Sequence, residues 1–106
     1  MDLPLRVVFT TVDDEAAARH IAHVLVEERL VACAQVESNP LHSVWTWEGE
    51  TQSGAEWRLM FKTVPAQVDP LRERLEELHP YDIPEFVVLH TDASEAYARW
   101  AEGSCS

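Results

Sequence analysis

The residues best suited to chemistry lie in the stretch HPYDIPEF, which begins at His79. Pro80 disfavours the helical conformation at the residue before it, so a preceding helix is expected to stop at His79. Pro84 restricts the backbone just ahead of the next strand. The imidazole of His79 and the carboxylate of Glu85, held in one rigid corner, are ligand types that suit Cu(II) or Zn(II). The alternative is structural, with His79 favoured at a helix C-terminus and Tyr81 anchoring a turn.

A second candidate is an aromatic pocket. Trp45 and Trp47 stand two positions apart in a predicted strand, so both point to the same face. We predict that Trp47 and Tyr81 line a small-molecule pocket, with Glu48 and Lys62 as polar contacts. The alternative is a strand end whose aromatic side chains pack against a neighbouring element.

Three further groups carry metal-capable side chains. His20, His23 and Glu27 fall within about 60° of arc on a helix, which would suit a surface zinc or form a solvated helix face. Cys33 lies in a strand among apolar neighbours and is expected to be a buried small hydrophobe. Cys105 is expected in a frayed tail, where it would be an adventitious metal or oxidation site.

The elements that must position these residues follow from the apolar spacing. Period-two alternation predicts strands, and apolar residues three and four apart predict helices. Three of the strands are separated by short turns, so an antiparallel meander is expected. The turn between the second and third of these is placed at Gly49 and residues 51–54. Asp13 and its acidic neighbours favour a helix start, and Asp69-Pro70 are expected to cap and open the next long helix. The predicted elements are strands at 5–12, 32–38, 42–50, 56–63 and 86–91, and helices at 13–29, 68–78 and 94–102.

This β-α-β-β-β-α-β-α order predicts an α+β, ferredoxin-like sandwich. Its antiparallel sheet would carry two helices on one face, plus a short C-terminal helix. The 106 residues are expected to form a single domain, 1–106. Four tryptophans are many for one small core, so some are expected at a partner interface.

Composition excludes several classes of protein. The net charge of −11 argues against nucleic-acid binding, which needs a basic surface. The first residues lack a basic region and a long apolar run, and no stretch approaches the roughly 18 apolar residues of a membrane span. We therefore predict a cytoplasmic protein with reduced thiols. No Ser-His-Asp grouping, nucleotide-type glycine loop or H-E-x-x-H motif is present, so no enzyme activity is expected.

The chain resembles the CutA family of divalent-cation tolerance proteins. The resemblance rests on six stretches in order, which together cover nearly the whole chain: TTVDDE, LVACAQV, SVWTWEGE, FKT, HPYDIPE and YARW. It implies a ferredoxin-like protomer that assembles into a tight homotrimer, tolerance of copper and other divalent metals, and no catalysis. Some family members carry a cysteine near the end of the first strand and a histidine before the His-Pro pair. Here those places hold Thr10-Thr11 and Leu78, which removes metal-capable side chains.

Two functions from different classes follow. The first is a homotrimer that binds Cu(II) or other divalent cations weakly and contributes to metal tolerance, with no required cofactor and only copper or zinc as a candidate ion. The second is a signalling or scaffold trimer, similar in shape to the PII-type proteins, that binds a small metabolite or partner protein in the cleft between protomers.

Overall fold

A computed structural model describes residues 1–105, and its helices and strands occur in the predicted order. The elements are β1 (Asp2–Val12), α1 (Glu15–Glu27), β2 (Cys33–Val36), β3 (Leu41–Trp47), β4 (Glu50–Thr63), a 3₁₀ turn η1 (Pro65–Gln67), α2 (Val68–Leu78), β5 (Val87–Ser94) and α3 (Glu95–Ser104). Boundaries differ from those expected by a few residues, because hydrogen bonding to neighbouring strands, and not apolar pattern alone, sets where a strand ends.

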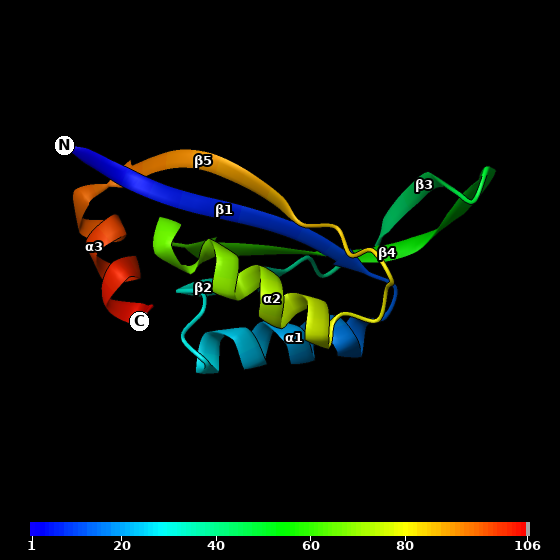
Figure 1. The fold of residues 1–106 in the computed structure, drawn as a ribbon, viewed down its shortest axis with the longest axis horizontal. Helices are drawn as coiled ribbons and strands as arrows, with labels where there is room; N and C mark the ends of the chain where they lie inside the picture. Colours follow the sequence, from blue (N-terminus) through cyan, green and yellow to red (C-terminus); the bar gives the residue numbers. More distant parts are fainter. Residues whose placement is uncertain (106) are drawn as a thin grey trace.

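The strands form one antiparallel sheet in the order β2-β4-β1-β5, with β3 paired to the outer part of β4. β1 lies in the middle, where Val8 pairs with Phe61 of β4 on one side and with Val88 of β5 on the other. α1 and α2 lie side by side against one face of this sheet (Figure 1). The predicted α+β architecture, an antiparallel sheet with two helices on one face, is therefore confirmed.

The core lies between the sheet and the two helices. Alternate residues of β1 and β4 point towards the helices, and each helix contributes an apolar stripe with a spacing of three or four residues. Burying these side chains drives the packing of the two layers. The central members are Val8, Val12, Ile21, Leu25, Leu59, Phe61, Leu71 and Leu75, none of which is more than 1% exposed.

The two long helices begin differently. Asp14 caps α1, because its Oδ2 accepts a hydrogen bond of 2.8 Å from the amide of Ala17. The expected cap of α2 at Asp69-Pro70 is wrong: α2 already begins at Val68, and its N-cap Gln67 makes no side-chain capping bond. The reason is the 3₁₀ turn η1, whose Pro65 starts the helical path three residues before Val68.

β3 and β4 form a hairpin that projects from the body as an arm (Figure 1). Its turn consists of Glu48 and Gly49, whose φ angles are 51° and 82°. Two successive positive φ angles define a type I′ turn, whose twist matches that of the flanking strands. The turn expected over residues 51–54 is therefore wrong. Those residues continue β4, and Thr51 and Gly54 pair with Thr46 and Ser43.

α3 closes the end of the sheet opposite the arm (Figure 1). Its N-cap Ser94 accepts a 3.3 Å hydrogen bond from the amide of Tyr97. Cys105, which was expected in a frayed tail, is only 5% exposed, and its Sγ lies 3.8 Å from the hydroxyl of Thr63. The correction has a physical cause: the last turn of α3 packs against β4 and buries the thiol. Among residues 1–105, every helix is too short or too polar to serve as a membrane span.

Candidate functional site

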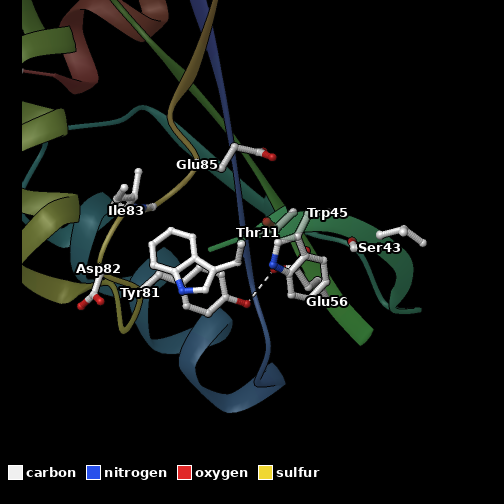
Figure 2. Close-up of a pocket in the computed structure, with 11 residues that line it drawn as sticks. Thr11, Ser43, Trp45, Glu56, Tyr81, Asp82, Ile83 and Glu85 are labelled. Atoms are coloured by element: carbon white, nitrogen blue, oxygen red, sulfur yellow. Dashed lines mark hydrogen bonds between the residues drawn. The ribbon is translucent and has the colours of Figure 1, made fainter. Parts of the chain in front are cut away.

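A cavity of about 630 Å³ lies where the arm meets the loop that joins α2 to β5. Trp45 and Trp47 of β3 are among its lining residues. Tyr81 of the loop lies across from Trp45 (Figure 2). Glu56 of β4 and Glu85 of the loop supply carboxylates. Its volume is in the range of natural small-molecule sites, which typically measure about 300–1,000 Å³.

His79 holds the start of this loop in place. It is buried, at 7% exposure, and its Nε2–H donates a 2.9 Å hydrogen bond to the backbone carbonyl of Thr11. Its Nδ1 accepts a 3.2 Å hydrogen bond from the amide of Tyr81. Because one nitrogen donates and the other accepts, the ring is neutral and protonated on Nε2. Burial lowers the pKa of His79, and the Thr11 carbonyl and the charges of Glu56 and Asp13 oppose this shift only in part.

The Tyr81 side chain joins the loop to the sheet. Its hydroxyl donates a 2.6 Å hydrogen bond to Oε2 of Glu56 across 25 positions of sequence, drawn as a dashed line in Figure 2. Glu56 is only 8% exposed as a residue, so this hydrogen bond lies at a largely buried position. Burial, followed by the hydrogen bond to Glu56, raises the pKa of Tyr81, so the phenol stays protonated and keeps donating.

Glu85 is exposed and forms no hydrogen bond or ion pair within residues 1–105. Partial desolvation raises the pKa of its carboxyl, the negative charge of Glu56 raises it further, and Arg58 acts in the opposite direction. Glu85 and Glu56 therefore lie near enough to repel each other when both are ionised. Such a pair favours an added positive charge between or beside them.

The predicted site residues separate into two groups. Trp47 and Tyr81 line the cavity. Glu48 and Lys62 do not, which corrects the expectation that they are its polar contacts. Glu48 forms part of the turn at the tip of the arm. The ammonium of Lys62 lies 5.8 Å from the ring centre of Tyr97 on α3, at the other end of the sheet.

The predicted metal ligands are placed less favourably. Both ring nitrogens of His79 are engaged, so a metal-binding role would require the bond to Thr11 or to Tyr81 to break. His20, His23 and Glu27 are exposed on α1. Within residues 1–105, no group of three or more His, Cys, Asp or Glu side chains is placed to hold a metal ion. A metal bound at Glu85 would therefore need ligands from water or from a second copy of the chain.

Sequence reasoning did not find Glu56. The only signal was its position, since it precedes the apolar run of β4 and shares its alternation with Arg58. Its partner Tyr81 lies beyond α2, and neither composition nor periodicity connects residues that far apart. The contact between His79 and the Thr11 carbonyl was missed for a similar reason, because a backbone acceptor leaves no mark in the sequence.

The chain matches known proteins in sequence and in fold. The model of the CutA1 divalent ion tolerance protein family matches residues 6–104. The chain belongs to the CutA1 family. It is 41% identical over 95 residues to the divalent-cation tolerance protein CutA of Thermus thermophilus, which covers 89% of this chain and 91% of that protein. It is 36% identical over 103 residues to the chloroplastic protein CutA of Arabidopsis thaliana. That alignment covers 96% of this chain but spans 56% of the plant protein.

Solved CutA structures show the same fold. The Thermus thermophilus Cut A1 protein superposes with a TM-score of 0.91 at 38% identity, covering 96% of this chain and 99% of that one. CutA1 from Oryza sativa gives a TM-score of 0.91 at 32% identity, covering 99% and 96% of the two chains. The arm, the sheet and α3 of this chain are therefore all within the extent of a CutA1 fold.

Proposed function

We propose that the protein contributes to divalent-cation tolerance as a homotrimer that binds Cu(II) or other divalent cations weakly. Membership of the CutA1 family supports the general function. The observation that supports the proposal is Glu85, an unpaired carboxylate in the lining of the cavity that lies within the electrostatic influence of a second, Glu56. A cavity that offers carboxylates and no free imidazole is a poor ligand set for Cu(II), so weak binding is expected.

Assembly is supported by apolar surface that one copy leaves uncovered. The sheet face opposite α1 and α2 presents Val87 and Leu89, 47% and 42% exposed. Val44 of the arm is 62% exposed, and Trp45 and Trp47 are 42% and 41% exposed. A second copy of the chain has both features, so the arm of one copy can cover the open sheet face or cavity of the next. Light scattering should give three times the protomer mass of 12.1 kDa, and a stable monomer would contradict this.

Metal binding is tested by Cu(II) titration calorimetry of the wild type and three variants. Glu85→Gln keeps the shape of the side chain, and loss of one ligand is expected to weaken binding at least about tenfold. His79→Gln is expected to have a much smaller effect, because its ring is already engaged. His20→Gln, on the exposed face of α1, is the matched control for adventitious binding. Equal isotherms for the wild type and Glu85→Gln would show that this corner is not the metal site.

The second candidate, a signalling or scaffold trimer that binds a small metabolite, is favoured by the cavity itself. Its aromatic side chains take no part in metal coordination, yet most of the surface that a ligand would contact in the cavity is apolar. A cytoplasmic location remains a prediction, since one relative is named as chloroplastic.

A further inference from the structure

The lining of the cavity combines aromatic and acidic side chains. Three aromatic side chains, Trp45, Trp47 and Tyr81, share the lining with the carboxylates of Glu56, Asp82 and Glu85. No Lys, Arg or His is among the lining residues of the described chain. An anionic ligand would meet uncompensated negative charge here, and a neutral one would leave the carboxylates without a partner.

Glu56 is the carboxylate whose position in the cavity is best fixed. It is only 8% exposed, and its Oε2 accepts a hydrogen bond from the Tyr81 hydroxyl. Its Oε1 makes no hydrogen bond within residues 1–105 but remains in contact with solvent, so it is open to a ligand. Arg58, two residues further along β4, forms an ion pair with Glu37, with 2.6 Å between its Nη2 and the Oε1 of Glu37. One oxygen of this carboxylate is therefore satisfied by Tyr81, and the other is free to face a positive group in the cavity.

The aromatic walls distinguish between kinds of positive group. A divalent metal needs several donor atoms, and residues 1–105 gather no group of three side chains for it. An organic ammonium ion makes use of both features, because its charge is attracted to the faces of Trp and Tyr rings and to a nearby carboxylate. Ordinary small-molecule sites combine apolar walls with a few well-placed polar groups in the same way.

We propose that this cavity binds an organic ammonium cation, with Trp45, Trp47 and Tyr81 contacting its alkyl groups and Glu56 and Glu85 facing its charge. This rests on the small-molecule function proposed above. The site shares Glu56 and Glu85 with the proposed metal site, but the aromatic residues contribute nothing to metal coordination and so distinguish the two. Tyr81 has a second role here. By donating to Oε2, it turns the remaining oxygen of Glu56 towards the ligand.

The test compares two probes of the same shape. Choline carries a quaternary nitrogen, and dimethylbutanol is its neutral isostere, with carbon in place of that nitrogen. Both are titrated into the assembled protein and followed by tryptophan fluorescence and calorimetry. Choline is expected to bind at least about tenfold more tightly than the isostere, because only choline gains the attraction to the carboxylates and ring faces.

Variants then separate the contributions. Glu56→Gln still accepts from Tyr81 but loses its charge, and is expected to weaken choline binding about tenfold while leaving the isostere unchanged. Trp47→Leu is expected to weaken both probes and to leave the Cu(II) isotherm unchanged. Glu102→Gln, on α3 at the far end of the molecule, is the control of equal charge change. Light scattering on each variant checks that assembly is intact.

The outcomes are distinguishable. If both probes bind equally, the cavity accepts small molecules but the inferred charge preference is wrong. If neither probe binds, both the ammonium proposal and the small-molecule function are overturned. Weaker assembly of Glu56→Gln would then indicate that a basic side chain of a second copy occupies the site. If choline binds and Glu56→Gln has no effect, the carboxylate has no part in recognition and the proposal also fails.

Discussion

Replacement of His79 tests whether the corner is held by hydrogen bonds or merely shaped by its prolines. His79→Ala removes the bond to the Thr11 carbonyl and the bond from the Tyr81 amide. Each is worth about 1 kcal/mol net, and the buried carbonyl left unsatisfied adds to this cost. Truncating a buried ring also leaves a cavity. Together these give a loss of about 2–4 kcal/mol in the free energy of unfolding.

Urea denaturation measures this loss. With a slope of about 2 kcal/mol per molar urea, the midpoint should fall by about 1–2 M. All variants are compared at one protomer concentration, because assembly adds to apparent stability. His79→Gln, which keeps a donor near the position of Nε2, should recover part of the loss. His23→Ala, on the exposed face of α1, is the control and should change little.

The pH dependence gives an independent check. Burial lowers the pKa of His79 below its usual value, so between the two values the unfolded chain binds more protons than the folded one. Stability should therefore rise with pH through this window and fall as pH drops below about 6.5. His79→Gln should remove that part of the slope. A midpoint for His79→Ala close to that of the wild type, with the pH slope also unchanged, would refute the assignment of His79 as the residue that fixes the loop.

Two further predictions concern the thiols and the arm. Burial raises the pKa of Cys105, and the hydrogen bond with the Thr63 hydroxyl opposes this shift only in part. In the folded protein, this thiol should therefore react with Ellman's reagent at least about tenfold more slowly than Cys33. Equal rates would contradict the packing of α3. Glu48→Asn places a residue that tolerates a positive φ angle beside Gly49. It should raise the free energy of unfolding by about 0.5–1 kcal/mol in a urea titration. A lower free energy of unfolding would show that the Glu48 side chain makes a needed contact elsewhere.

Local patterns were enough to predict the architecture. Alternation in β1 and β4 and helical spacing in α1 and α2 each reflect one buried face, and a buried face is what the sequence records most directly. The turn of the arm was misplaced because the polar run after Gly49 looks like a loop. In the structure, those residues are polar because they lie on an exposed hairpin, not because they turn.

The candidate site was only partly predictable. Trp47 and Tyr81 could be found because their residue types stand out within a short stretch. Glu56 and the Thr11 carbonyl could not, since their roles depend on contacts with residues about 25 and 68 positions away. Lys62 was assigned to the wrong end of the sheet because β4 is longer than expected. A strand of 14 residues carries Glu50 and Lys62 to opposite ends of the molecule.

The length of β4 also determines which changes in chain length the protein can accept. β4 runs without interruption from the tip of the arm to Thr63, so one strand has both an exposed half and a buried half. An insertion of one residue at the Glu48-Gly49 turn alters only the tip. The same insertion between Trp57 and Leu59 would rotate every following side chain to the opposite face, turning Phe61 out of the core and Lys62 into it. Natural variation in length should therefore be confined to the turn, while the inner half of β4 should accept substitutions but no insertions or deletions.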